Sequence, residues 1–228
     1  MHPNPIYHDA DASRNLAYAR ERAFGVLATN ADSGPLLGHV PFLLNEAGDM
    51  AELHLVRSNP IARMLREPLQ VKIAVSGPDT YVSPDWYGVP DQVPTWNYVA
   101  VHLTGVLEPR PQEELLDLLD RQSAFYEERL LPKPPWKTVK MTEDVLNKMM
   151  RQIVPCRMQI TDVDGTWYKL TAINCLAGVD VGSGIGPEEP LARCAISCAQ
   201  GSSGDTCYPN DADYYESLAI YSLGGQCE

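Results

Sequence analysis

The feature that most constrains this fold is the alternation of apolar and polar residues within segments of strand length. Residues 98–107 place Val99, Val101 and Leu103 on one side, because successive side chains of a strand point to opposite faces. Comparable segments, bounded by turn residues, occur at 24–29, 36–44, 50–56 and 70–75. The pattern predicts a mainly β protein.

Turn signals connect these segments. Residues 32–34, Asp-Ser-Gly, separate the first two predicted strands and predict a hairpin with a short loop. The Asp-Gly pair at 164–165 predicts another hairpin, between strands at 157–161 and 166–170. Roughly seven strands are therefore expected.

Helical spacing occurs three times, each time after a start signal. The segments are residues 11–22, residues 112–131 and the segment that follows Thr142. In the last of them, Val145, Met149 and Ile153 are expected to form the buried side. Strands with a few peripheral helices predict a small barrel, closed or half-open.

Composition divides the chain. Residues 1–170 carry a net charge of −5, whereas residues 171–228 carry −7 together with five of the six cysteines. The strand pattern is complete by Leu170, so we expect a barrel domain at 1–175 and a Gly/Ser/Cys-rich extension at 176–228.

Charge and hydropathy argue against several classes of protein. The formal charge of −12 and the pI near 4.8 repel phosphate backbones. The basic residues between Lys133 and Arg157 fit a solvated helix face and linker better than a nucleic-acid footprint, so direct DNA binding is not expected without a partner. The N-terminal residues lack the pattern of a secretory signal, and no apolar run is long enough to span a membrane. A cytoplasmic protein is the expectation.

The densest cluster of polar and aromatic residues lies between Ser76 and His102. Aromatic rings offer stacking area, and hydroxyl and amide groups offer hydrogen bonds to the edge of a flat heteroaromatic ligand. The same residues also fit a structural role, in which they pack a loop against the barrel. The candidate ligand-binding residues are Ser83, Trp86, Tyr87, Thr95, Trp96, Asn97 and Tyr98.

A second candidate group follows a predicted strand at residues 57–59. Arg57, Ser58 and Asn59, at the start of a predicted helix, could bind a phosphate or could form an ordinary capping turn.

His39 interrupts an apolar strand, where a histidine is more often a packing residue than a ligand. The sequence contains no P-loop, nucleophile elbow or H-x-x-x-H pair, and its cysteine spacing does not favour zinc.

Taken in order, four motifs resemble those of the PaiB family. They are GHVPFLL (38–44), LVRSNP (55–60), SGPDTYVSPDWY (76–87) and VPTWNYVAVH (93–102), followed by an amphipathic helix and a segment ending in Lys169-Leu170. PaiB proteins are called FMN-binding negative transcriptional regulators and resemble the split barrels of pyridoxamine phosphate oxidases. The resemblance covers residues 6–169.

The resemblance implies a homodimeric split β-barrel with an FMN cleft at the subunit interface. Arg57, Ser58 and Asn59 would lie near the phosphate, and the aromatic segments near the ring. His39 and Lys169 join this candidate cofactor-binding set. A second subunit is also expected from the residues themselves, if Val99, Val101 and Leu103 are not covered by the chain's own helices.

The implied function is negative regulation of transcription through a bound ligand or a partner. One alternative is a flavin-dependent oxidoreductase on the same scaffold, because reduced flavin supplies the redox chemistry itself. Another is a haem-binding protein that uses the same cleft, with His39 or His102 as the axial ligand.

Overall fold

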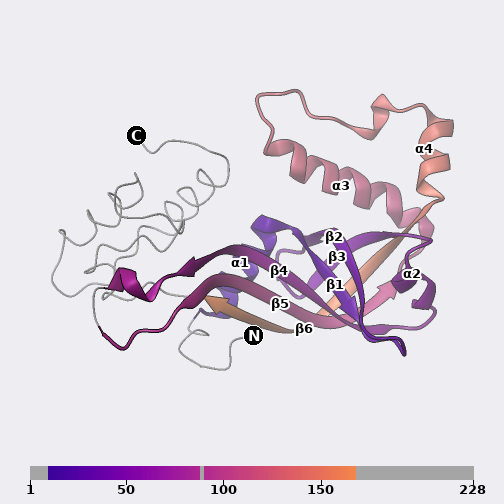
Figure 1. The fold of residues 1–228 in the computed structure, drawn as a ribbon. Helices are drawn as coiled ribbons and strands as arrows, with labels where there is room; N and C mark the ends of the chain where they lie inside the picture. The colour runs from indigo at the N-terminus through magenta and orange to yellow at the C-terminus, as the bar shows by residue number, and fades with distance from the viewer. Residues whose placement is uncertain (1–9, 88–89, 168–228) are drawn as a thin grey trace. The chain divides into compact units, whose positions relative to one another are not determined.

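The computed structural model describes residues 10–87 and 90–167. Within these residues, six strands form a closed barrel in the order β1-β2-β3-β6-β5-β4 (Figure 1). The strands are β1 (Phe24–Thr29), β2 (Leu36–Leu44), β3 (Met50–Val56), β4 (Leu69–Val82), β5 (Thr95–Pro109) and β6 (Ile153–Trp167). The predicted mainly β barrel with peripheral helices is confirmed.

The described residues belong to two compact units. Unit 1 contains residues 10–76 and 100–165, which include β1, β2, β3 and all of the α-helices. Unit 2 contains residues 77–99, which are the far end of β4, the 3-10 helix η2 (Pro84–Tyr87) and the beginning of β5, together with residues 166–167. The predicted domain boundary after residue 175 lies outside the described residues.

The predicted hairpin at the Asp-Gly pair is wrong. Strand β6 runs without interruption through residues 162–165 and pairs with β3 from Ile153 to Gln159. Gly165 serves close packing instead of a turn, since a Cβ atom there would lie 2.0 Å from Oδ1 of Asn15 on α1 (Ala12–Arg22). The barrel therefore has six strands where the sequence suggested about seven.

The interior of the barrel is apolar and tightly filled. Among the residues whose side chains are fully buried are Leu27, Phe42, Leu53, Ile73, Val101, Leu103 and Met158. Val99, Val101 and Leu103 are buried on β5, as their alternation predicted. Because they are buried within this chain, the condition under which they would need a second subunit is not met.

Helix α3 (Leu115–Glu128), preceded by the 3-10 helix η3 (Gln112–Glu114), lies against the outside of the barrel beside β2 and β3 (Figure 1). Leu115, Leu118 and Gln122 form its buried side. The remaining helices are α2 (Pro60–Met64), the 3-10 helix η4 (Thr138–Lys140) and α4 (Glu143–Met150).

Helix α4 does not bury the side that the sequence predicted. Val145 and Met149 are 48% and 56% exposed, and no residue of the helix is fully buried. The helix is fixed at its C-terminal end instead, where Nε2 of Gln112 donates to the carbonyl of Met150 at 3.0 Å. A hydrogen bond to the backbone thus holds α4 in place of apolar packing. The amphipathic pattern of the sequence could not reveal this bond.

At Gly105, β5 approaches β6 too closely to leave room for a side chain, and this contact should be essential to the barrel. A Cβ atom there would lie 2.1 Å from the carbonyl oxygen of Gln159, which is backbone and has little freedom to move. We expect Gly105→Ala to lower the free energy of unfolding by about 1 to 3 kcal/mol, the usual cost of overpacking.

Gly38→Ala is the matched control in urea denaturation. Its nearest neighbour would be Nδ2 of Asn59 at 3.4 Å, an ordinary contact. This variant should change stability by less than about 1 kcal/mol. Equal stabilities for the two variants would contradict the packing argument.

Candidate functional site

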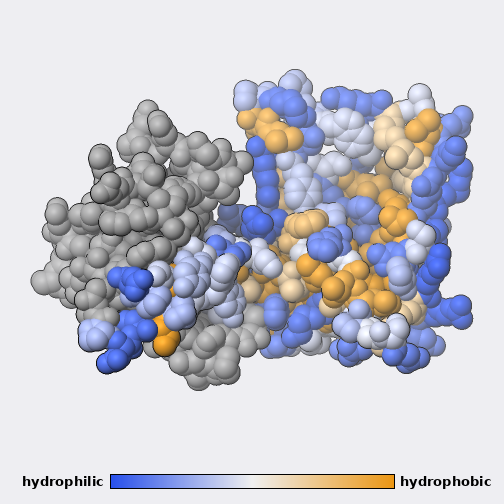
Figure 2. All heavy atoms as spheres, in the orientation of Figure 1, coloured by the Kyte–Doolittle hydropathy of each residue, from blue (hydrophilic) through white to orange (hydrophobic). Residues whose placement is uncertain are grey.

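The outer surface of β1 to β3 exposes apolar and aromatic side chains. Phe24, Leu37 and Val56 are 48%, 62% and 52% exposed. His39 also faces outward, between buried neighbours on β2, and its ring stacks on Phe24 with centroids 6.4 Å apart. We call Phe24, Leu37, His39 and Val56 the outer-face patch. Figure 2 shows apolar atoms reaching the surface over the barrel strands.

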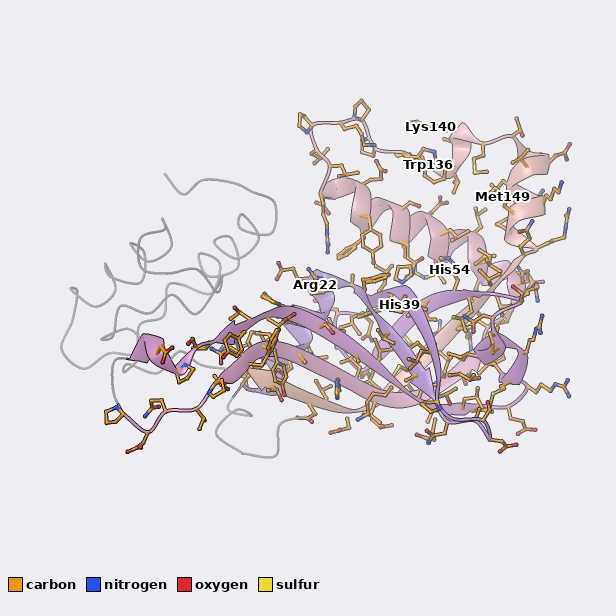
Figure 3. All side chains as sticks on the ribbon, in the orientation of Figure 1. Arg22, His39, His54, Trp136, Lys140 and Met149 are labelled. Carbon is orange, nitrogen blue, oxygen red and sulfur yellow. The ribbon has the colours of Figure 1, made fainter. Side chains whose placement is uncertain are left out.

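Next to this patch, α3 fixes a second histidine. Nδ1 of His54 lies 3.1 Å from Oε1 of Gln122, whose Nε2 donates to the carbonyl of Pro41 at 3.5 Å. Because an amide oxygen only accepts, Nδ1 carries the hydrogen and Nε2 of the neutral ring keeps its lone pair. Burial lowers the pKa of His54, and the bond with Gln122 offsets part of this effect. Figure 3 shows His39 and His54 on the barrel beneath α3.

A network of charges attaches α3 to the barrel. Glu52 on β3 accepts from Arg121 on α3 at 2.7 Å and from Arg157 on β6 at 3.2 Å. Glu114, at the end of η3, pairs with Arg110 at 2.8 Å. The sequence analysis missed this network, since its members are far apart in the chain. Its role is to hold α3 over the strands that carry the two histidines.

The predicted phosphate loop follows β3. Arg57 is exposed, with Nε donating to the carbonyl of Arg151 at 2.7 Å and Nη2 donating to Oε1 of Gln112. Ser58 is exposed, whereas Oδ1 of Asn59 accepts from the backbone N–H of Ile61 at 2.9 Å and caps α2. Arg57 and Ser58 are therefore accessible, and Asn59 organises the loop.

Unit 2 contains the predicted aromatic residues. Nε1 of Trp96 donates to Asp79 at 2.9 Å, and the exposed rings of Trp96 and Tyr81 lie 6.2 Å apart. Asn97 is buried on the opposite face of β5, and its Oδ1 has no hydrogen-bond partner among the described residues. Such a buried acceptor is costly unless a donor reaches it.

The remaining candidates have less defined surroundings. Ser83, Thr95 and Tyr98 are half-buried, and the hydroxyl of Ser83 accepts from the backbone N–H of Asp85 at 3.4 Å. The side chains of Trp86 and Tyr87, and all of Lys169, lie outside the described residues. Unit 1 thus carries His39 and the 57–59 loop, and unit 2 carries Ser83 and the segment 95–98.

His102, a predicted alternative haem ligand, is half-buried on β5 and faces away from the core. Burial and the positive charge of Lys72 lower its pKa. His39, the other predicted haem ligand, is exposed in the outer-face patch. The two histidines are thus in different surroundings.

Comparison with known proteins identifies the family. Residues 1–162 match the family described as "Putative FMN-binding domain". This chain belongs to that family. It is also 28% identical over 156 residues to the "Protease synthase and sporulation protein PAI 2" of Bacillus subtilis, which is 68% of this chain and 73% of that protein. An uncharacterized protein of Saccharomyces cerevisiae is 31% identical over 81 residues, 32% of this chain and 48% of its own length. The predicted resemblance to PaiB proteins is confirmed.

Solved structures give the fold. An FAD- and haem-binding protein from Mycobacterium smegmatis has a TM-score of 0.50 at 15% identity, covering 90% of this chain and 95% of that one. The flavocytochrome Anf3 from Azotobacter vinelandii has a TM-score of 0.50 at 12% identity, covering 94% of each chain. The predicted split barrel is thereby confirmed.

Membership of the family assigns FMN as the cofactor. The described residues include groups suited to its phosphate and to its flat ring. In unit 1, Arg57 and Ser58 present accessible donors of the type that binds phosphate. The Phe24–His39 pair presents an aromatic surface against which a flat ring can stack. No helix among the described residues is long and apolar enough to cross a membrane.

The half-buried histidines should make stability depend on pH. Both pKa values are lowered from 6.5 in the folded protein, so the unfolded chain binds more protons between the lowered values and 6.5. The free energy of unfolding should therefore rise with pH through this window and level off above it. Urea denaturation at several pH values between about 5 and 8 measures this slope.

Substitution of the two histidines tests whether they cause the pH dependence of stability. His54→Gln and His102→Gln should each reduce it, and the double variant should reduce it further. A slope that the double variant leaves unchanged would contradict the assignment. Values below pH 5 are left out of the comparison, because carboxylates also titrate there.

Proposed function

We propose that this protein is a cytoplasmic FMN-binding homodimer that represses transcription through its bound ligand or a partner. Family membership carries the flavin part of the proposal. The accessible donors after β3 and the aromatic residues on the outer face support it. The regulatory part rests on the resemblance to PaiB proteins, which are called negative transcriptional regulators.

Arg57 and Ser58 bind the FMN phosphate in this proposal. The guanidinium is held by bonds from Nε to Arg151 and from Nη2 to Gln112, so its orientation is fixed before a ligand arrives. Nη1 makes no hydrogen bond within the described part of the chain. Preorganised donors lose less entropy when they bind an anion.

Loss of Arg57 should discriminate between two flavins. We expect Arg57→Ala to weaken FMN binding by about ten- to a hundredfold, because a charge-assisted bond contributes about 1.5 to 3 kcal/mol. Riboflavin, which lacks the phosphate, should bind the variant and the parent equally. Titration of both ligands by flavin fluorescence measures the difference.

Arg63→Ala provides the control, because Arg63 is an exposed arginine on the neighbouring helix α2. It should bind both flavins as the parent does. If Arg57→Ala weakened both flavins equally, Arg57 would act only by anchoring the chain around Gln112 and Arg151.

A second copy of the chain covers the outer-face patch in this proposal. The apolar residues of the patch lie on adjacent strands and are 48% to 62% exposed, and such contiguous surfaces usually mark interfaces. This support replaces the argument from Val99, Val101 and Leu103, which are buried in the barrel.

Leu37→Asp should separate the dimer. A carboxylate without a partner in an apolar interface costs about 3 kcal/mol or more. Light scattering at micromolar concentration should give twice the chain mass for the parent and 25.2 kDa for the variant. Leu131→Asp, at an equally exposed leucine outside the patch, should remain dimeric. A parent mass of 25.2 kDa would contradict the dimer.

Regulation through a ligand or partner is favoured over direct reading of DNA. The net charge of −12 repels the DNA backbone. The basic residues between Lys133 and Arg157 adjoin exposed apolar side chains and lie partly in ion pairs, with Lys133 bonded to Glu127 and Arg157 to Glu52. A salt-resistant, sequence-specific DNA complex of the purified protein would contradict this part of the proposal.

Two other functions use the same fold. A flavin-dependent oxidoreductase would need no acid–base pair in the chain, because the cofactor supplies the redox chemistry. A haem-binding protein would use His39 or His102 as a ligand. Two solved structures with this fold are those of an FAD- and haem-binding protein and a flavocytochrome. An absorbance spectrum of the purified protein separates flavin, with bands near about 370 and 450 nm, from haem, with its Soret band.

A further inference from the structure

The segment between α3 and β6 presents apolar side chains that nothing in the described chain covers. Val139 in η4 is 85% exposed, and Val145 and Met149 on α4 are 48% and 56% exposed. Val145 and Met149 are four residues apart, so they share one side of the helix. We call these three residues, with Lys137, Lys140 and Lys148, the α4 surface. Figure 3 shows Lys140 and Met149 in this part of the molecule.

This surface is positively charged in an acidic protein. Residues 137–151, which carry this surface, contain four basic and two acidic residues, whereas the whole chain has a net charge of −12. Among the described residues, Lys137, Lys140 and Lys148 form no ion pair, in contrast to Lys133, which is bonded to Glu127. Nζ of Lys140 donates to the carbonyl of Pro135 at 3.3 Å, a bond that leaves its charge without a counter-ion. The three ammonium groups can therefore still pair with an acidic partner.

The surface is held in place by polar contacts from α3 and η3. The hydroxyl of Thr138 donates to Asp120 at 2.6 Å, and the backbone N–H of Trp136 donates to Glu127 at 2.8 Å. At the other end, Gln112 holds the carbonyl of Met150 at 3.0 Å. Apolar side chains on a backbone fixed in this way lose little entropy on binding, which favours recognition.

Three other occupants fit less well. A second copy presenting the same surface would bring six lysines together. A bilayer is disfavoured, because α4 has only eight residues and exposes no aromatic residue or leucine for insertion. Nucleic acid is disfavoured by the apolar side chains of the surface, which a phosphate backbone cannot pack against.

We propose that the α4 surface binds an acidic amphipathic segment of a partner protein. The apolar side of that segment packs on Val139, Val145 and Met149, and its carboxylates pair with Lys137, Lys140 and Lys148. The surface shares no residue with the outer-face patch or with Arg57 and Ser58. The proposal therefore does not depend on flavin binding.

A labelled helical peptide of glutamate, leucine and alanine, with leucine at helical spacing, is the probe. We expect it to bind the full chain in fluorescence anisotropy, with a dissociation constant of about 10 to 100 μM that rises with salt. The same peptide with lysine in place of each glutamate should not bind.

Two sets of variants locate the contact. Lys140→Glu with Lys148→Glu, and separately Val145→Ser with Met149→Ser, should each weaken binding of the acidic peptide at least tenfold. Lys72→Glu, at an exposed lysine on β4, and Leu131→Ser, at an exposed leucine, are the matched controls and should change it less than twofold. Circular dichroism and FMN titration, both expected to match the parent, show that the variants are folded.

Several outcomes would overturn the proposal. They are the absence of acidic-peptide binding at about 1 mM, equal binding of both peptides, and equal effects of the α4 variants and their controls. Stronger binding of phosphatidylserine vesicles or duplex DNA than of the acidic peptide, lost in the α4 variants, would assign the surface to lipid or nucleic acid. If the parent protein did not bind FMN, the proposed flavin function would be contradicted, but the proposal for the α4 surface would not.

Discussion

Closure of the barrel by β6 is the constraint on which the rest of the structure depends. Strand β6 pairs with β3 and lies next to β5, so the strands that precede it in the chain become a ring without free edges. The contact between Gly105 and the backbone of Gln159 permits this closure, because any side chain at Gly105 would separate the two strands. The chain between β5 and β6 must then run outside the ring, and it forms α3 and α4.

The path of the chain between β5 and β6 decides which side chains on the outer surface are covered and which stay exposed. Helix α3 is fastened by Glu52 and Arg121 and covers His54, while Phe24 and His39 remain exposed beside it. The chain returns through a segment held by Thr138 and leaves one side of α4 uncovered. The two exposed apolar surfaces in unit 1 thus differ in chemistry. One is aromatic and lies on the strands, and the other is edged by lysines.

Arg57 shows how one side chain can serve both stability and binding. Its bond to Arg151 joins the end of β3 to the connection between α4 and β6, and its bond to Gln112 joins it to η3. The same bonds fix the guanidinium beside the accessible Ser58. Asn59, which sequence reasoning grouped with these two residues, is occupied in capping α2. The sequence pattern identified the loop at residues 57–59. Only the hydrogen bonds in the structure show that its three residues have different roles.

The sequence alone determined most of the strands, the inward face of β5 and the family, because side-chain alternation and ordered motifs are local properties. The bounds of β1, β2 and β3 and the burial of Val101 and Leu103 were predictable for that reason. Tertiary structure decided what local pattern could not. It placed Gly165 against α1 instead of in a turn, and it left Val145 and Met149 exposed. It also joined Glu52 to Arg121 and Arg157, because such pairings depend on how distant segments meet when the barrel closes.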